Sequence, residues 1–556
     1  MSNMPMQTEV LIVGAGPTGL LAANMLATYG VPFRIIDKDP GPTSESRATI
    51  VHGRTIELLD KLGLSESILQ NGQRVFRATL ARNQRTLANF PISGAEDDPS
   101  PFSFAVMHEQ WKTEGLLNRT LEAIGGHVEW STEFVSLESE TTGNRVTVKD
   151  AGGNQETLFA RYVIAADGAR SPIRQQLGIT FEGSTYEQIA FTGDVDMRTD
   201  LPRDALNLLY FREGFVGFVP LKSESGHAYR LIGTLPDKLE ADVRAGRKNG
   251  IDTDDLKHIF EMHLKTSAQL LTVHHLQLYR LHRRLVGTYR HRNVFLAGDA
   301  AHLHSPAGGQ GMNTGIGDAF NLSWKLAMVI KGWAQPDLLE SYDPERRYVA
   351  ETVLNGSDKG FALESSKHPV MQVFNNHILP SLIRVANKVP AARRFNSRLF
   401  SQNWVNYSKS PSVAVANGPR GLQPGARFPY IKLEAGEHQG KTTHELIRGL
   451  NHQLFVFDGT PAKKTQAHAA SIQKALQTSA LPIDVIIIAP SCSSAYKICG
   501  VEVNEPTVFL IRPDGHVAFR GSVNNLNALE TYLGRVYTKV APFKVTDSSL
   551  GHTDCV

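Results

Sequence analysis

The segment from Glu9 to Asp37 constrains the fold more than any other part of the chain. It opens with the apolar run Glu9–Val13, whose Val and Ile content predicts a buried parallel strand. The turn Gly14-Ala15-Gly16-Pro17-Thr18-Gly19 follows, and helix formers then continue to Gly30, which predicts the helix end. A second apolar run, Val31–Asp37, closes on an acid. This order predicts a Rossmann-like α/β unit.

The same unit predicts dinucleotide binding. Gly14 permits a tight turn, Gly16 lets a pyrophosphate approach the backbone, and Gly19 lets helix and strand pack closely. The helix N-terminus offers N–H groups and the positive end of a dipole to phosphates. Asp37 would accept a hydrogen bond from a ribose hydroxyl. A glycine-rich turn without a ligand is the alternative, and it leaves Asp37 unexplained. The unit alone does not decide between NAD and FAD.

A polar motif follows a second predicted strand. The run Arg161–Ala166 reads as buried strand and ends in Asp167-Gly168. Ser171 followed by Pro172 predicts a helix N-cap with proline at the first helical position. Ligands of open α/β sheets bind at the carboxyl ends of the strands. We therefore expect Asp167 beside the dinucleotide.

A third strand end carries a longer motif. Asn293–Ala297 predicts a strand, and Gly298-Asp299 follows it directly. A glycine-rich loop, Pro306–Asn313, then precedes a helix predicted over Thr314–Lys331. Such a loop before a helix is an anion or carbonyl cradle. Asp299, at a strand end, suits a ribose or ribityl hydroxyl.

These ordered motifs resemble those of the group A FAD-dependent aromatic hydroxylases, the family of p-hydroxybenzoate and phenol hydroxylases. The stretch GDAAHLHSPAGGQGMNTGIGDAFNLSWKLA, residues 298–327, is similar to the second FAD motif of that family, and DGARSPIR, residues 167–174, to its Asp-Gly motif. Arg47 within RATIVHGRTIELL and Gln110 within HEQWKTEGLL match the remaining FAD-contacting positions. The resemblance extends from Val10 to about Ala350.

The resemblance implies a monooxygenase that uses FAD, takes electrons from NADPH or NADH as a transient co-substrate, and reacts with O2. A flavin hydroperoxide would hydroxylate a phenolic or polyketide-like small molecule. Baeyer–Villiger oxidation or epoxidation on the same scaffold is one alternative, because fold does not fix reaction. A non-catalytic flavin-binding interaction protein is another. The cofactor-binding residues expected are Gly14, Gly16, Gly19, Asp37, Lys38, Arg47, Gln110, Asp167, Asp299, Gly309, Gly311, Met312 and Asn313.

The resemblance also implies catalytic roles. The carbonyl of Pro306 would face the substrate, with Pro306 close to the flavin ring. The helix that starts near Gly311 would direct its positive end at the flavin pyrimidine and stabilise negative charge there. Tyr210 and Arg212 are candidate partners of a general base that deprotonates a phenol. The protein itself would supply orientation, electrostatics and exclusion of water.

The predicted fold class is α/β with three parts. A Rossmann-like FAD-binding domain comprises residues 1–178 and 290–350. Residues 179–289 alternate like antiparallel strands and form an inserted substrate-binding sheet. In that sheet Tyr210, Phe211, Arg212, Phe215 and Phe218 are candidate pocket residues, half of which must face away. Residues 351–420 are a helical connection, and 544–556 a flexible tail.

Residues 421–543 resemble the thioredoxin-like tail of phenol hydroxylases, including the turn Arg512–Gly515. Cys492 and Cys499 are not in a Cys-x-x-Cys pair, so we expect no dithiol chemistry. The expected role of this tail is packing, or dimerisation into a homodimer.

Bulk properties exclude other classes. The 58 basic and 55 acidic residues give a net charge of +3, which gives no reason to expect a nucleic-acid or membrane partner. No apolar run approaches the roughly 18 residues of a membrane helix, and the N-terminus lacks a signal peptide pattern. We expect a soluble, cytoplasmic protein. We expect no metal, because His302 and His304 have no further ligand at suitable spacing, and interpret both as satisfied loop histidines.

Two basic clusters, His282–Arg284 and Arg290–Arg292, are interpreted as solvated surface, with attraction of NAD(P)H phosphates as the alternative.

Overall fold

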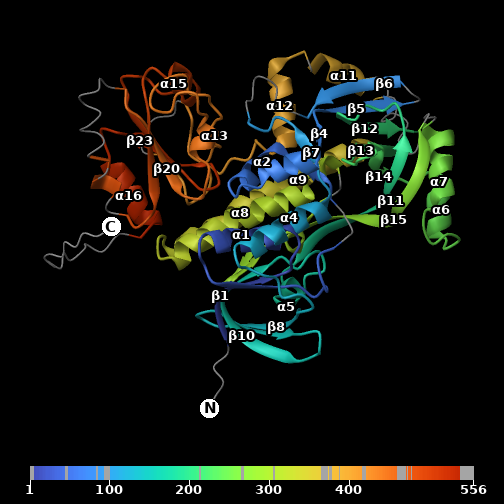
Figure 1. Ribbon diagram of the computed structural model, residues 1–556, viewed down its shortest axis with the longest axis horizontal. Coiled ribbons are helices and arrows are strands. Elements are labelled where there is room, and N and C mark those ends of the chain that lie inside the picture. The colour runs from blue at the N-terminus through green and yellow to red at the C-terminus, as the bar shows by residue number, and fades with distance from the viewer. Residues whose placement is uncertain are drawn as a thin grey trace, which may run out of the picture.

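The computed structural model describes residues 6–43, 48–82, 85–92, 100–211, 214–264, 268–304, 307–364, 374, 378–386, 388–415, 421–459, 471–472, 474–476 and 479–538. Three residues expected in the site, Arg47, Arg212 and Pro306, lie outside this set. Figure 1 shows the chain folded into a central α/β part, a green sheet on one side and an orange to red C-terminal part on the other.

The central part is built on a seven-stranded sheet. Its strands β17, β10, β1 and β2 are parallel and adjacent in that order, with β16 outside β17. A β8–β9 hairpin extends it from β10. Apolar side chains on both faces explain the buried strand runs. The strands are β1 (Met6–Val13), β2 (Phe33–Ile36), β8 (Glu133–Ser139), β9 (Asn144–Lys149), β10 (Gln155–Ala165), β16 (Arg290–His291) and β17 (Val294–Leu296).

Helices α1 and α8 pack side by side on this sheet, and a small three-stranded sheet, β3-β7-β4, lies beside them. The predicted Rossmann-like domain is therefore confirmed. The elements are α1 (Pro17–Thr28), β3 (Ile50–Val51), α2 (Gly53–Asp60), α3 (Ser65–Asn71), β4 (Gln73–Val75), β7 (Ala105–Met107), α4 (Gln110–Ala123), α5 (Pro172–Gln176), η2 (Gly298–Ala300), η3 (Ala307–Gly309), α8 (Gly311–Ile330), η4 (Pro336–Ser341) and α9 (Tyr342–Glu364).

The second sheet has eight strands in the order β18-β15-β11-β14-β13-β12-β5-β6. The sequence predicts this sheet from residues 179–289 alone, whereas the structure adds two strands from residues 77–91 and a short one after residue 301. Strand β5 pairs parallel with β12, a long-range pairing that alternation within one strand does not encode. The strands are β5 (Arg77–Arg82), β6 (Arg85–Pro91), β11 (Phe181–Arg198), β12 (Ala205–Tyr210), β13 (Phe215–Pro220), β14 (Ala228–Thr234), β15 (Gln269–Val286) and β18 (His302–Leu303).

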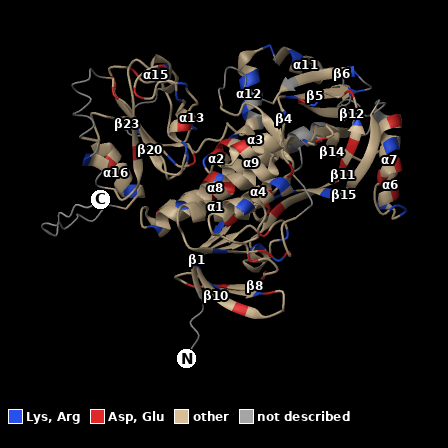
Figure 2. Cartoon of the chain, viewed as in Figure 1, with Lys and Arg blue, Asp and Glu red and all other residues tan. Residues whose placement is uncertain are grey.

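Helices cover this second sheet from two directions. α6 (Asp237–Arg244), α7 (Thr253–His258) and η1 (Ile259–Leu264) bury one face around Phe191 and Phe218. α11 (Leu379–Ala386) and α12 (Pro390–Ser401) lie against β6, at the edge of the molecule. In Figure 2 the charged residues of these two helices are all basic, and the sequence shows that they are arginines.

The C-terminal part is a five-stranded sheet in the order β19-β23-β22-β20-β21. Strand β20 is parallel to β21 and antiparallel to β22, which gives the mixed sheet expected of a thioredoxin-like unit. Helix α9 crosses the border predicted between residues 350 and 351, because helical periodicity carries no mark of a domain border. The elements are β19 (Ala414–Val415), α13 (Thr443–Leu446), β20 (His452–Phe457), β21 (Ile483–Ile488), α15 (Ser493–Cys499), β22 (Thr507–Ile511), β23 (Val517–Ser522) and α16 (Asn527–Val536).

The C-terminal part packs directly on α8. The rings of Trp324 and His452 lie 5.6 Å apart, and a single buried apolar cluster runs through both parts. Among the described helices, none is long and apolar enough to cross a membrane.

Candidate functional site

Four parallel strands end in one row, and this row defines the candidate site. Val13 of β1 is in register with Ile36 of β2 and with Ala165 of β10, and Ala165 is in register with Leu296 of β17. The residues that follow these strand ends therefore share one edge of the sheet. These residues are Gly14, Asp37, Asp167 and Asp299.

The turn Gly14–Gly19 is tightly packed at two of its glycines and open at the third. Gly14 has a φ of +103°, and a Cβ there would lie 2.2 Å from the carbonyl oxygen of Ala166. A Cβ on Gly19 would lie 1.9 Å from the carbonyl oxygen of Gly14, so α1 and β1 pack too closely for any side chain. A Cβ on Gly16 would meet nothing within 4 Å. Two glycines are thus required by packing, and Gly16 borders open space.

Asp37 holds the turn from the neighbouring strand end. Its Oδ2 accepts a hydrogen bond from the backbone N–H of Ala15 at 2.6 Å, and its Oδ1 accepts one from Asp39 at 2.9 Å. Carboxylate oxygens have further lone pairs, so Asp37 retains the capacity to accept from a hydroxyl. The next residue, Lys38, is exposed.

Gln110 begins α4 and fixes the chain beside Arg47. Its Oε1 accepts from the N–H of Ala48 at 3.2 Å, and its N–H donates to the Ala48 carbonyl at 3.0 Å. These bonds hold the residue next to Arg47, which lies outside the described residues. In this structure Gln110 therefore holds the backbone at Ala48.

Asp167 is a half-buried carboxylate that can accept further hydrogen bonds. Its Oδ2 accepts from the N–H of Ile173 at 3.3 Å, whereas its Oδ1 is buried without a hydrogen-bond partner. Burial raises the pKa of Asp167 to about 6, although the Ser171 hydroxyl and the charge of Arg174 oppose the rise. A buried acceptor without a donor is costly, and a ligand donor would relieve the cost.

Arg174 links the Asp-Gly loop to the turn that carries Asp299. Its guanidinium donates to the carbonyls of Ala169 and Ala300, both at 2.9 Å, and lies 3.9 Å from the centre of the Phe181 ring. Asp299 itself is exposed in the short helix η2. An exposed carboxylate at a strand end is placed to reach a bound hydroxyl.

The loop before α8 is fixed by Asn313 and His52. The Oδ1 of Asn313 accepts from the N–H of His52 at 2.9 Å, and its Nδ2 donates to the carbonyls of Ile50 and Gly309, both at 2.8 Å. Gly308 and Gly309 have φ values of +77° and +60°. The first-turn N–H groups of α8, from Gly311, Met312 and Asn313, have no partner within the helix by geometry. They form the positive end of a long helix.

Sequence reasoning missed His52. Its Nε2 lies 2.8 Å from the carbonyl oxygen of Gly308, and its Nδ1 is buried without a hydrogen-bond partner. Burial lowers the pKa of His52 to about 4, so the ring is neutral at pH 7. Because a carbonyl only accepts, Nε2 carries the proton and Nδ1 is a bare acceptor beside the glycine loop. A histidine just before a helix within an already recognised motif was the available signal.

The two loop histidines differ. His302 bonds Asp318 of α8 at 2.7 Å, and Asp318 also accepts from Arg346 at 2.6 Å. His304, by contrast, has two buried ring nitrogens without a hydrogen-bond partner. The interpretation of both as satisfied is wrong for His304, because the oxygens of Asp318 already accept from Gly298, His302 and Arg346. The described residues contain no cluster of three or more potential metal ligands.

Strand alternation decides which aromatic residues share a face. Tyr210 and Phe215 cluster with Tyr279 on one face of the second sheet, whereas Phe211 and Phe218 belong to the cluster buried under α7 and η1. The face with Tyr210 and Phe215 continues into a cluster that contains Ile50 and Met107 of the central part. This face of the second sheet is therefore the one that lies toward the strand-end site.

A charged pair on this face was also missed. Arg230 of β14 pairs bidentately with Asp194 of β11, at 2.7 and 2.6 Å, and donates to the Thr49 hydroxyl at 2.6 Å. The Arg230 side chain is 2% exposed. Burial raises the pKa of the neighbouring Tyr279. An arginine inside an otherwise apolar strand, Ala228–Thr234, was the signal in the sequence.

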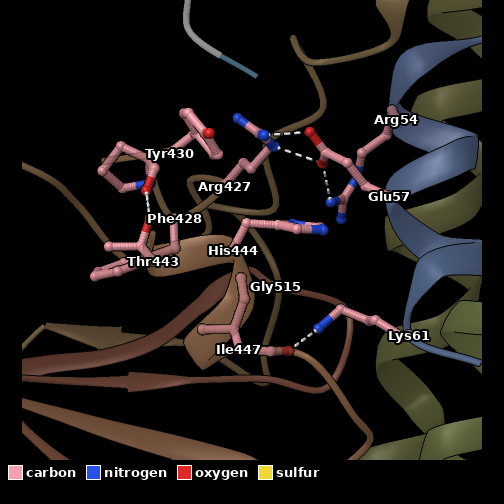
Figure 3. A pocket seen from close by; sticks show the side chains of 11 residues that line it. Arg54, Glu57, Lys61, Arg427, Phe428, Tyr430, Thr443, His444, Ile447 and Gly515 are labelled. Atoms are coloured by element: carbon pink, nitrogen blue, oxygen red, sulfur yellow. Dashed lines mark hydrogen bonds and ion pairs between the residues drawn. The ribbon is translucent and has the colours of Figure 1, made fainter. Parts of the chain in front are cut away.

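A separate hollow lies where α2 meets the C-terminal part (Figure 3). Glu57 accepts from Arg54 at 3.0 Å and from Arg427 Nε at 2.9 Å, and Lys61 donates to the carbonyl of Ile447. Burial opposes ionisation of Glu57, yet the charges of Arg427 and Arg54 lower its pKa to about 2. Its charged groups satisfy one another, so this hollow is a domain joint distinct from the strand-end site.

The strand-end site fits a flavin dinucleotide. The space above Gly16, the acceptors on Asp37 and Asp299, the bare acceptors on Asp167 and His52 and the positive end of α8 together match a phosphate-linked ligand rich in hydroxyl and N–H groups.

Comparison with known proteins decides the family. The FAD binding domain model matches residues 7–357, and the model of the aromatic-ring hydroxylase C-terminal domain matches residues 422–539. Pentachlorophenol 4-monooxygenase of Sphingobium chlorophenolicum is 35% identical over 84% of this chain and 83% of its own length. The chain belongs to the group A FAD-dependent aromatic hydroxylases.

The hydroxylase has further full-length relatives. 6-Methylpretetramide 4-monooxygenase of Streptomyces rimosus is 30% identical over 94% of this chain and 93% of its own length. The solved structure of the OxyS anhydrotetracycline hydroxylase from Streptomyces rimosus superposes with a TM-score of 0.72 at 26% identity, covering 96% of this chain and 99% of that chain. The predictions of a flavin-dependent monooxygenase and of FAD as its cofactor are confirmed.

Proposed function

We propose that this hydroxylase inserts one oxygen atom of O2 into an aromatic ring of a phenolic or polyketide-like small molecule, with NADPH or NADH as the electron donor. The second oxygen atom leaves as water, and a ring C–H becomes C–OH. The observation that carries the proposal is the similarity, over 84% and 94% of the chain, to monooxygenases whose names specify pentachlorophenol and 6-methylpretetramide. FAD, when bound, supplies the two-electron chemistry and the activation of O2.

The chain's own residues hold and polarise the cofactor in this proposal. The open backbone at Gly16 receives the pyrophosphate, and Asp37 and Asp299 accept from ribose and ribityl hydroxyls. Asp167 accepts at the Asp-Gly loop. The N-terminus of α8, led by Gly311, stabilises negative charge on the ring system. Lys38, Arg47, Gln110, Gly309, Met312 and Asn313 complete the proposed set, with Pro306 facing the substrate.

The face of the second sheet toward this edge orients the substrate. Tyr210, Phe215 and Tyr279 offer aromatic surface to a planar ring. Arg230, held by Asp194, presents guanidinium N–H groups on the same face, and a hydrogen bond donated to the substrate oxygen would favour the phenolate over the phenol. Tyr210 keeps its proposed role as a partner of the general base that deprotonates the phenol, with Arg212 beside it in the sequence.

The decisive experiment supplies 18O2 and NADPH or NADH to the FAD-loaded enzyme with a panel of phenols and polycyclic polyketides. We expect one labelled oxygen in a ring hydroxyl, with substrate-stimulated consumption of the nicotinamide. A labelled lactone would indicate Baeyer–Villiger oxidation instead of hydroxylation, and a labelled epoxide would indicate epoxidation. Nicotinamide consumption that no substrate of the panel stimulates would contradict the proposal.

Arg230→Gln tests the substrate face. We expect KM for a phenolic substrate to rise at least tenfold with FAD content unchanged, because a guanidinium hydrogen-bond donor at the proposed site is lost. Arg77→Gln, on the same sheet in an exposed pair with Asp204, is the matched control and keeps KM.

Assembly as a homodimer and an intracellular site of action complete the proposal. The two described cysteines, Cys492 and Cys499, are free thiols, which suits a reducing compartment. Light scattering of the FAD-loaded protein measures its mass in solution.

A further inference from the structure

An apolar stripe is exposed on α11. Ile378, Leu382 and Val385 lie at i, i+4 and i+7, so they share one side of the helix, and Val389 follows in the turn to α12. Their exposed fractions are 48%, 53%, 62% and 45%. Leu379, Ile383 and Ala386 lie on the less exposed side of the helix, which packs against β6. The helix is therefore apolar on its outer side as well as on its packed side.

Among the residues that the structure describes on α11, on α12 and in the turn between them, every charged side chain is a cation. Arg384 lies next to the stripe on α11 and also donates to the carbonyl of Leu87 at 2.8 Å. Lys388 follows the end of the helix, and three further arginines lie on α12. The sequence contains no Asp or Glu between Glu364 and Glu434. The strands beneath, β5 and β6, carry Arg77, Arg82 and Arg85 and likewise no acid. The α12 arginines are Arg393, Arg394 and Arg398.

Figure 2 shows this concentration of positive charge at one edge of a chain whose net charge is only +3. The nearly equal numbers of basic and acidic residues gave no reason to expect a membrane partner. The charges are nevertheless unevenly distributed along the chain, because residues 365–433 contain no Asp or Glu.

We propose that α11 and α12 form a docking surface for an anionic lipid bilayer. The exposed apolar side chains would insert among the acyl chains near the headgroups, while the flanking Lys and Arg side chains contact the lipid phosphates. A helix with one apolar side and basic flanks is the pattern of helices that lie in the membrane interface. The binding is peripheral and requires no spanning helix.

Charge complementarity selects this occupant over a second copy of the chain. A two-fold contact places the same patch against itself, and here that would oppose like charges on both copies. Helix α11 also lies at the edge of the molecule (Figure 1).

The experiment measures co-sedimentation of the FAD-loaded, full-length protein with vesicles. One set contains phosphatidylcholine alone, and the other adds phosphatidylglycerol at about one third of the lipid. We expect binding to the anionic set at least tenfold tighter than to the neutral set, and weaker binding as salt increases, since salt screens exposed charges. Equal binding to both sets, or none to the anionic set, overturns the proposal.

Two double variants separate the apolar and the charged contribution. Leu382→Gln with Val385→Gln removes the centre of the stripe. Its control, Met262→Gln with Leu271→Gln, removes two exposed apolar residues elsewhere, at 62% and 42%. We expect at least a tenfold loss of vesicle affinity in the first and none in the control.

Lys388→Gln with Arg394→Gln removes two cations of the docking surface. We expect about a thirtyfold loss, since each Lys or Arg near an anionic surface contributes about fivefold. Lys238→Gln with Lys497→Gln, two exposed lysines elsewhere, is the control that keeps binding. FAD content verifies that each variant is folded. A loss of self-association in the stripe variant, with vesicle binding intact, would assign the surface to a second copy and overturn the proposal.

Discussion

Arg512 of the C-terminal part and Glu345 of α9 form a buried bidentate ion pair. The two N–O distances are 2.7 and 2.8 Å, and the side chains are 0% and 1% exposed. Lys325 of α8 lies 2.8 Å from the same carboxylate. Burial opposes ionisation of Glu345, yet the charges of Arg512 and Lys325 hold its pKa well below the usual range. The pair joins the two parts of the chain through their common core.

Arg512→Met should destabilise the protein strongly. It leaves the carboxylates of Glu345 and Asp514 buried without their arginine, and breaking a buried pair in this way typically costs about 3–5 kcal/mol. Urea unfolding of the FAD-loaded enzyme measures the change in unfolding free energy. Arg145→Gln, which breaks the exposed pair with Glu140, should change it by less than about 1 kcal/mol. Equal effects of the two changes would contradict the structural role of Arg512.

The Arg512–Glu345 pair gives a physical basis to the expected packing role of the C-terminal part. Arg346, the neighbour of Glu345, donates to Asp318 at 2.6 Å and to the carbonyl of Thr314 at 3.0 Å, both on α8. Hydrogen bonds therefore run from the C-terminal part to the first turns of the helix that borders the cofactor site.

Gly16→Ala separates folding from cofactor binding. Gly16 has a φ of −70°, which alanine adopts, and an added Cβ meets nothing within 4 Å. We expect a folded protein that has lost at least tenfold in FAD affinity, because the Cβ occupies the space proposed for the pyrophosphate.

Gly19→Ala is the contrasting variant, since its Cβ would lie 1.9 Å from the Gly14 carbonyl oxygen. It should lower the unfolding midpoint even without FAD. Circular dichroism and FAD titration measure both effects. Normal FAD affinity in folded Gly16→Ala would place the cofactor elsewhere.

Asp299→Ala should impair flavin retention while the cysteine variants do not. Loss of a hydrogen bond to a bound hydroxyl costs about 1–3 kcal/mol of binding free energy. Burial raises the pKa of Cys499 to about 12, and the thiol of Cys492 donates to the carbonyl of Ala435 at 2.9 Å, so neither is an activated thiolate. Flavin content after gel filtration is the measurement, with Cys492→Ser and Cys499→Ser as controls. Equal loss of activity in the cysteine variants would show redox chemistry in the C-terminal part.

The local motifs could be predicted from the sequence because each depends on neighbours in the chain. The turn at Gly14–Gly19, the strand before Asp167 and the helix after the glycine loop all follow from short-range patterns. Helix α8 starts at Gly311 rather than at Thr314. The sequence pattern places its start too late, because the glycine and asparagine of its first turn have low helix propensity.

Long-range pairings account for what the sequence did not predict. The partnership of β5 with β12, the pair of Arg230 with Asp194 and the pair of Arg512 with Glu345 each join residues far apart in the chain. The two faces around Tyr210 and Phe211 follow from strand alternation, but which face turns inward depends on the packing of β14 against the central part.

Asp167→Asn should stabilise the flavin-depleted protein, and more so at higher pH. The pKa of Asp167 is raised from 3.8 to about 6, so the folded state holds a proton that the unfolded state has released between these values. Stability contributed by this group is therefore complete below about pH 4 and falls as pH rises through about 6. Asparagine cannot ionise, and the variant avoids this loss. Since each unit of pKa shift is worth about 1.4 kcal/mol, we expect its advantage to be about 1 kcal/mol larger at pH 7.5 than at pH 5.0.

Urea unfolding at both pH values measures the difference in the stabilising effect of Asp167→Asn. Asp254→Asn, at a side chain that is 90% exposed, is the control, and its effect should not grow with pH. An advantage that shrinks with rising pH would mean that the carboxylate is stabilised in its charged form, with the charge of Arg174 and the hydrogen bonds to Asp167 outweighing burial.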